Sequence, residues 1–280
     1  MKKAIIAAIF ALLSSVSFSQ TAGENVFKDV TANGKTISLR LHVLSITEYD
    51  SGGNEIHHKE SYGAERWTEY DSRGNVIHCK NSSGAEKWYE YDSRGNEIHF
   101  KNSGGFEQWF EYDSRGNKIH SKDSDGFEEW FEYNRKGKVI HCKNSDGGEW
   151  RYEYDRNGNE IHCKSSEGFE QWSEYDRKGN VIHYKDSGGS EDWSAYDKKG
   201  NKIYCKDSSG SEWRYEYDGS GNMIHCKNSN GDESWIEYDS RGNVIHSAFH
   251  YTSLEDREFW YEYTFWDNGT VKTKIRYSTF

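Results

Sequence analysis

The chain has 280 residues, a formal net charge of −11 and a hydrophobic fraction of only 33%. Its acidity excludes DNA, RNA and an anionic membrane surface as expected partners. Disorder is excluded as well, because disordered segments are poor in aromatic residues and this chain contains 11 Trp, 20 Tyr and 13 Phe. The complete lack of proline means that no Pro-rich linker divides the chain, and one continuous β body is expected.

Residues 1–19 are expected to be a secretory signal peptide. Lys2 and Lys3 precede an apolar run over residues 4–13, and small residues then lead to an expected cleavage point near Ser19. The run is too short to cross a bilayer and no second one follows, so no membrane span is predicted. Loss of the two lysines takes the net charge from −11 to −13. We expect an extracytoplasmic protein, either periplasmic or secreted.

Residues 20–48 are expected to form N-terminal cap strands. A turn is predicted over residues 31–35, where Asn33 and Gly34 lie together, and residues 37–43 alternate as a strand does. This segment lacks the spacing of the residues that follow. Atypical ends are the rule in repeat proteins.

Residues 49–248 are an array of about ten units, each 21 residues long. Glycine follows four residues after the tyrosine that marks each unit, and isoleucine follows seven residues after it. The marker tyrosines are Tyr49, Tyr70, Tyr91, Tyr112, Tyr133, Tyr154, Tyr175, Tyr196, Tyr217 and Tyr238. In a typical unit, residues 86–91 and 97–101 alternate charged with aromatic or β-branched residues, whereas residues 92–96 and 102–105 have turn chemistry. Each unit is therefore predicted to be one β-hairpin.

Turns this short allow pairing only between sequence neighbours, because a parallel crossover needs a dozen residues or more. The predicted fold class is all-β: a repetitive antiparallel β-meander of about ten 21-residue hairpins that forms an elongated, twisted or spiral sheet. The hairpin register stays open at this point. A four-residue loop pairs Tyr91 with Ile98 and Glu90 with His99, whereas a three-residue loop shifts both pairs.

Residues 249–280 are expected to form a C-terminal capping hairpin. Its turn is predicted at Asp267, Asn268 and Gly269, and residues 271–277 form the last strand. That strand carries lysines and an arginine. We interpret them as charges that protect an exposed edge strand from pairing with another chain.

The string Tyr-Asp-x-x-Gly-Asn-x-Ile resembles the YD repeat of RHS-type proteins over residues 49–246. The resemblance implies hairpins that form a spiralling β-sheet, which in large members of the family closes into a shell around a toxin domain. Weaker resemblances link the hairpin to choline-binding-type repeats, whose Gly-Trp step is absent here, and to MORN-like repeats, best matched at residues 265–271.

A tryptophan column is the first candidate binding feature. We expect either internal stacking of these rings or an exposed ladder that binds a sugar, a peptide or a partner sheet. In two units the order changes to Trp150-Arg151 and Trp213-Arg214, which should move the ring to the opposite face of the strand. The candidate ladder comprises Trp67, Trp88, Trp109, Trp130, Trp172, Trp193 and Trp235.

A histidine column is the second candidate feature. The column has a structural role, forms a pH-responsive surface or binds a metal. A pH response is physically reasonable because unperturbed imidazoles become charged near pH 6.5. Equivalent positions in adjacent hairpins lie about 9.6 Å apart, too far to share one zinc, so no metal site is predicted. His57 opens the column and Tyr204 is its one departure; the candidate pH-responsive residues are His78, His99, His120, His141, His162, His183, His225 and His246.

Lysine follows two residues after the histidines of the column from His57 to His225, and glutamate recurs just before nearly every Tyr-Asp pair. We interpret these charges as a stabilising cross-strand ladder, because an active site would break the symmetry of the repeats. The cysteines are expected to be free, half-buried thiols, since whole repeats separate them by more than a disulfide tolerates. They are Cys79, Cys142, Cys163, Cys205 and Cys226.

The sequence thus predicts an exported, non-enzymatic repeat scaffold that binds a macromolecular partner, protein or glycan, without a cofactor. Two alternatives stay open. One is a glycan-binding or cell-wall-binding module that uses the Trp and Tyr ladders. The other is a fragment or accessory of an RHS-type toxin shell. The sequence leaves the oligomeric state unspecified.

Overall fold

The structure is a computed structural model that describes residues 21–32 and 35–279. The expected signal peptide and its cleavage point lie outside the described residues. Within these residues the chain forms 23 β-strands, and none of the described segments is a helix long and apolar enough to cross a membrane. The all-β prediction is confirmed.

The strands divide into a repeated middle and longer ends. The first two are β1 (Asn25–Ala32) and β2 (Lys35–Tyr49). The last three are β21 (Val244–His250), β22 (Arg257–Phe265) and β23 (Val271–Thr279). Between them lie six-residue strands: β3 (Glu55–Glu60), β4 (Glu65–Tyr70), β5 (Val76–Asn81), β6 (Glu86–Tyr91), β7 (Glu97–Asn102), β8 (Glu107–Tyr112), β9 (Lys118–Asp123), β10 (Glu128–Tyr133), β11 (Val139–Asn144), β12 (Glu149–Tyr154), β13 (Glu160–Ser165), β14 (Glu170–Tyr175), β15 (Val181–Asp186), β16 (Glu191–Tyr196), β17 (Lys202–Asp207), β18 (Glu212–Tyr217), β19 (Met223–Asn228) and β20 (Glu233–Tyr238).

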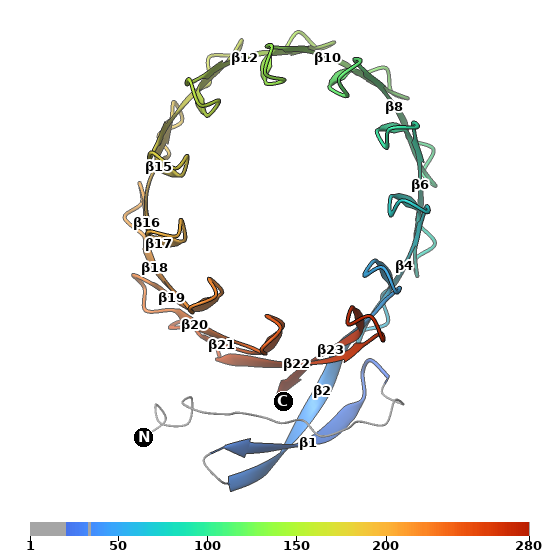
Figure 1. The fold of residues 1–280 in the computed structure, drawn as a ribbon, viewed down its shortest axis with the longest axis vertical. Coiled ribbons are helices and arrows are strands. Elements are labelled where there is room, and N and C mark those ends of the chain that lie inside the picture. The colour runs from blue at the N-terminus through green and yellow to red at the C-terminus, as the bar shows by residue number, and fades with distance from the viewer. Residues whose placement is uncertain (1–20, 33–34, 280) are drawn as a thin grey trace.

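The sheet closes on itself. Every strand pairs antiparallel with the next, and β2 also pairs with β23, with Val43 opposite Tyr277 and Ile46 opposite Ile275. Because β1 pairs only with β2, the other 22 of the 23 described strands form a ring (Figure 1). The meander of hairpins is thus confirmed, whereas the elongated, twisted or spiral sheet was wrong, because the sheet closes into a ring.

A constant shift in register explains the closure. Tyr89 on β6 lies opposite Phe100 on β7, which lies opposite Gln108 on β8. The equivalent of Tyr89 in the next unit is Phe110, two residues beyond Gln108. Each hairpin is therefore displaced by two residues along the strand direction relative to the hairpin before it. Two residues of rise over two strand spacings tilt the strands by about 35° and give a ring about 40 Å across. A tilt of that size is typical of closed sheets.

The Tyr-Asp turn has one geometry throughout. In the turn after β4, the Asp71 carboxylate accepts hydrogen bonds from the backbone N–H groups of Arg73 and Asn75 and from the Asn75 side-chain amide, all within 2.8–2.9 Å. Gly74 adopts φ +86°, which favours glycine. The marker tyrosine ties hairpins together, since the Tyr91 hydroxyl donates to the Val76 carbonyl at 2.8 Å.

The open question of register is settled by a β-bulge. Glu90 lies opposite His99, as the four-residue loop required, but Tyr91 lies opposite Glu97 rather than Ile98. Ile98 is the extra residue at the start of β7. It shifts the partner of Tyr91 by one residue and leaves the Glu90–His99 pair in place. Five residues, 92–96, connect the two strands.

The turn aspartates predict how the ring responds to acid. Hydrogen bonds from the Asn75 side chain and backbone hold the pKa of Asp71 below its ordinary 3.8, and equivalent contacts lower the pKa values of Asp92, Asp113 and Asp176. A lowered folded-state pKa stabilises the fold fully above 3.8, and this stabilisation disappears as pH falls through the folded-state value. We expect the urea midpoint to drop as the pH falls below about 4, and less so in the variant Asp71→Asn, Asp92→Asn, Asp113→Asn. A midpoint equally acid-sensitive in both proteins would contradict this.

The two faces of the sheet differ. His78 and Trp88 lie opposite each other on one face, whereas Tyr89 and Phe100 lie opposite each other on the other. Trp260 belongs to the first face, because it stacks on His246. β1 and the part of β2 that pairs with it extend outside the ring in Figure 1, and Leu41 and Val43 of β2 pack against Trp260. The face with the Trp–His pairs therefore points outward, and the Tyr and Phe face lines the interior.

The hydrophobic core lies at the seam where β2 meets β23. Leu41 and Val43 of β2 pack there against Trp260, Ile275 and Tyr277. Lys28 of β1 forms an ion pair with Glu262 at 2.7 Å beside this core. Both edges of β23 are paired, with β22 and β2, so the interpretation of its basic residues as edge protection was wrong.

Candidate functional site on the outer face

The repeating feature of the outer face is a histidine held between a tryptophan ring and two carboxylates. The His78 ring stacks on Trp88 with centroids 5.4 Å apart and planes 14° apart. Its Nε2 lies 3.0 Å from Glu86, and its Nδ1 lies 3.6 Å from Glu69. The side chains come from three successive strands, β4, β5 and β6. Their positions follow directly from cross-strand pairing.

This arrangement recurs around the ring, and we call it the outer ladder. Within the described residues there are eight His–Trp stacks, with centroid separations of 5.1–5.5 Å. The stacks are His57–Trp67, His78–Trp88, His99–Trp109, His120–Trp130, His162–Trp172, His183–Trp193, His225–Trp235 and His246–Trp260. Every predicted ladder tryptophan lies in it, and His141 is the one candidate histidine without a tryptophan partner.

The two glutamates of each unit have different roles. Glu86 is held by His78 and also by Lys80, at 3.5 Å, and these hydrogen bonds and charges lower its pKa. Glu90, beside His99, projects into solvent with 69% of its side chain exposed. We expected the glutamate before Tyr-Asp to form a charge ladder with the lysines, but it contacts histidine instead, and the lysines pair with the other glutamate, as Lys80 does with Glu86. The column that contains Glu86 was missed, although glutamate begins the first strand of nearly every unit.

One unit shows that histidine and the exposed glutamate occur together. Where the histidine column holds Tyr204, the opposite residue is Ala195 instead of glutamate. Arg214 takes the place of tryptophan in that unit, and its guanidinium lies 5.1 Å from the Tyr204 ring centre. The unit lacks both members of the Glu–His pair at once, so the pair is the element that repeats.

The two units with the order Trp-Arg place their tryptophan on the opposite face of the strand, as predicted. That face lines the interior of the ring. Trp150 lies opposite Cys142 on the inner face and packs against Phe169 with centroids 5.8 Å apart. Arg151 takes the outer position opposite His141. The inner tryptophans thus provide internal controls for the outer ones.

Each outer indole stacks on a histidine, and two of them also have a lysine over the ring. Trp88 is 38% exposed, although its histidine covers one ring face. A lysine lies over Trp130 and over Trp172, with Nζ 5.4 and 5.3 Å from the ring centres. A sugar that stacks on an indole requires a free ring face. This arrangement therefore leaves edges, carboxylates and the neighbouring isoleucines for contact with a partner.

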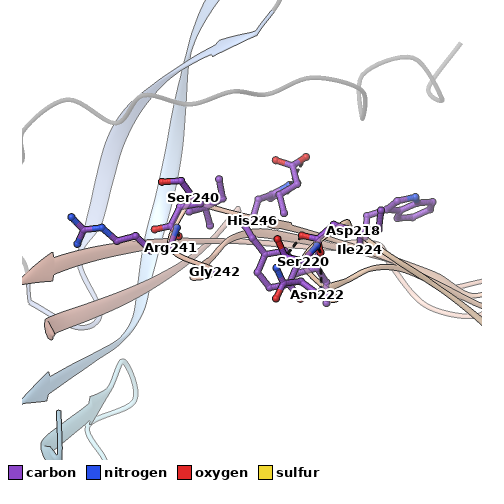
Figure 2. Close-up of a pocket in the computed structure, with 14 residues that line it drawn as sticks. Asp218, Ser220, Asn222, Ile224, Ser240, Arg241, Gly242 and His246 are labelled. Carbon is purple, nitrogen blue, oxygen red and sulfur yellow. Dashed lines mark hydrogen bonds and ion pairs between the residues drawn. The ribbon is translucent and has the colours of Figure 1, made fainter. Parts of the chain in front are cut away.

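A hollow near the seam shows how the ladder meets the turns (Figure 2). Trp235 and His246 of the ladder line it, together with Ile224 and Arg241. Arg241 and Gly242 belong to one Tyr-Asp turn, and Ser220 to the turn before it. The hollow is wide and shallow, and it forms part of the periodic surface.

The cysteines lie on the inner face and are free thiols. Four are half-buried, as predicted, and Cys163 is fully buried, with its pKa raised to about 11, mainly by burial. Cys142 Sγ lies 3.8 Å from the Tyr152 hydroxyl. Across the described part of the chain, no group of three or more His, Cys, Asp and Glu side chains is placed to hold a metal ion.

No protein-family model matches the chain, and no curated protein matches it. Solved structures are loosely similar. The crystal structure of TcdB2-TccC3-TEV matches 91% of this chain at 14% identity with a TM-score of 0.47, and TcdB2-TccC3-Cdc42 matches 91% at 14% with a TM-score of 0.46. The Tc holotoxin pore of Photorhabdus luminescens matches 85% at 13% identity with a TM-score of 0.43.

The chain spans only 17–18% of the length of these three chains. With TM-scores below 0.5, these likenesses specify neither a family, a partner nor an activity for this chain. Assignment to the YD repeat in particular stays a prediction from the motif.

Proposed function

We propose that this protein is an exported, non-enzymatic ring scaffold that binds a macromolecular partner through the outer ladder. One observation carries the proposal: the same solvent-facing set of Glu, His and Trp side chains recurs at a fixed spacing around the ring. A surface of identical sites suits a partner that repeats as well. An enzyme would instead need one unit that differs in its chemistry from the rest.

The chemistry of the ladder indicates what such a partner offers. Glu90 and its equivalents Glu111 and Glu132 are 68–69% exposed and lie at regular intervals. Exposed carboxylates favour cationic groups. Each contact is weak by itself, but linked contacts raise the overall affinity steeply. We therefore propose a partner that presents several Lys or Arg side chains.

The first test measures binding of fluorescently labelled decalysine to the mature protein by anisotropy in 150 mM salt. The triple variant Glu90→Gln, Glu111→Gln, Glu132→Gln should weaken binding at least about tenfold, because three linked sites are lost. The matched control removes the same charge from exposed turns through Asp125→Asn, Asp146→Asn and Glu167→Gln. Equal losses of decalysine affinity in both variants would show that binding depends on net charge alone and would refute a specific ladder.

The tryptophans give a second test. Trp88→Ala combined with Trp109→Ala should weaken decalysine binding several-fold, whereas Trp150→Phe with Trp213→Phe, on the inner face, should leave it unchanged. The same proteins on an array of cell-wall and host glycans address the alternative of a glycan-binding module. Glycan binding that depends on the outer tryptophans, without decalysine binding, would favour that alternative.

A further inference from the structure

The basic residues of β23 need an explanation, because their strand has no free edge. Ile275 and Tyr277 point outward into the seam core. The alternate residues Lys274 and Arg276 therefore face the interior of the ring, whereas Lys272 is the unpaired bulge residue between Val271 and Thr273. Corresponding inner positions on β5 hold Cys79 and Asn81, so this concentration of cations is particular to the seam.

Aromatic rings of the neighbouring strand support these cations. Each charged group lies over a ring on or just after β22, with the cation 4.7–5.8 Å from the ring centre. The pairs are Lys272 with Trp266, Lys274 with Tyr261, and Arg276 with Phe259. The rings hold the side chains in a row while their charges stay available.

Nearby carboxylates are already engaged. Glu60 contacts His58 Nε2 at 2.9 Å and forms a longer ion pair with Arg276 at 3.8 Å. Glu55 forms its ion pair with Arg66. Within the described residues, no carboxylate lies within ion-pairing distance of Lys274. Burial lowers the pKa of Lys274 most, the charge of Arg276 lowers it further, and the charge of Glu55 opposes this shift.

Alternate residues of a strand lie about 6.6 Å apart, so one small molecule with several negative groups reaches two of these cations together. We propose that Lys274 and Arg276 form a binding site inside the ring for a small polyanion that carries phosphate or carboxylate groups. A guanidinium beside an ammonium suits oxyanions, which take paired hydrogen bonds from arginine. This site is on the opposite face from the outer ladder and is independent of the proposed function.

Isothermal titration calorimetry of the mature protein in 150 mM salt tests the site with inorganic tripolyphosphate, orthophosphate and citrate. Tripolyphosphate or citrate should bind at least about tenfold more tightly than orthophosphate, because it reaches more than one cation. A preference between the two identifies phosphate or carboxylate as the recognised group. Lys274→Met and Arg276→Gln should each weaken binding about tenfold.

Lys118→Met is the matched control. Lys118 also faces the interior and lies over the rings of Phe110 and Phe131, but it belongs to β9, away from the seam. It should leave the affinity within about twofold. Should the seam variants unfold, the wild-type melting temperature should still rise with tripolyphosphate and not with sodium chloride of equal ionic strength. Failure of both polyanions to bind the folded wild type, or an equal loss in Lys118→Met, overturns the proposal.

Discussion

Replacing Trp260 by alanine is expected to lower the free energy of unfolding by about 3–5 kcal/mol, the usual cost of removing a buried aromatic side chain. Trp260 is only 5% exposed and packs against Leu41 and Tyr277 in the seam core. Its loss leaves a cavity where the two ends of the chain hold each other. Guanidinium unfolding followed by circular dichroism measures the effect.

Trp88→Ala is the matched control for this experiment. Trp88 stacks on a histidine in the same way as Trp260, but no second layer covers it. Its replacement removes the stacking and part of the packing, so we expect a cost of only about 1 kcal/mol. Equal losses for the two variants would show that the seam contributes no more than any other unit.

Lys28→Met is expected to cost about 3–5 kcal/mol, because it leaves the Glu262 carboxylate buried without its cation. The two side chains are 8% and 13% exposed and lie 2.7 Å apart. Tyr277 also donates a hydrogen bond to Glu262, so the carboxylate cannot turn toward solvent without losing that contact as well. Urea unfolding measures the loss.

Two controls separate this ion pair from the rest of the protein. The double variant Lys28→Met, Glu262→Met should recover much of the loss, since it removes the unpaired charge. Arg66→Met breaks an ion pair with Glu55 in which arginine is 56% exposed, and it should cost at most about 1 kcal/mol. No recovery in the double variant would mean that Lys28 acts through packing alone.

The repeated strands were predictable because their signals are local. Glu86, Trp88 and Glu90 alternate with Lys87, Tyr89 and Tyr91, and a turn with a required glycine follows. The same alternation placed Trp150 and Trp213 on the inner face. The bulge that pairs Tyr91 with Glu97 was not predictable, since it depends on how the Tyr-Asp turn fits the twist of its strands.

Closure of the sheet has no local signal. The Trp266 indole N–H donates to the Tyr49 carbonyl at 3.1 Å, although the two residues are 217 positions apart. Whether β2 and β23 meet depends on the register shifts of all the hairpins added together. Reading β23 alone therefore made its lysines look like protection for an exposed edge. The anchored glutamates, such as Glu86, were missed because their role depends on neighbours from two other strands.

The constant register has a consequence for how such proteins change during evolution. Every unit adds the same length of circumference and the same displacement along the strands. Whole units can therefore be gained or lost by recombination, while β2 and β23 keep their own surfaces for meeting. Cys142 and Cys205 lie three units apart, as do Cys163 and Cys226, which fits one such duplication. Ring diameter is thus a property that gene rearrangement can adjust in discrete steps.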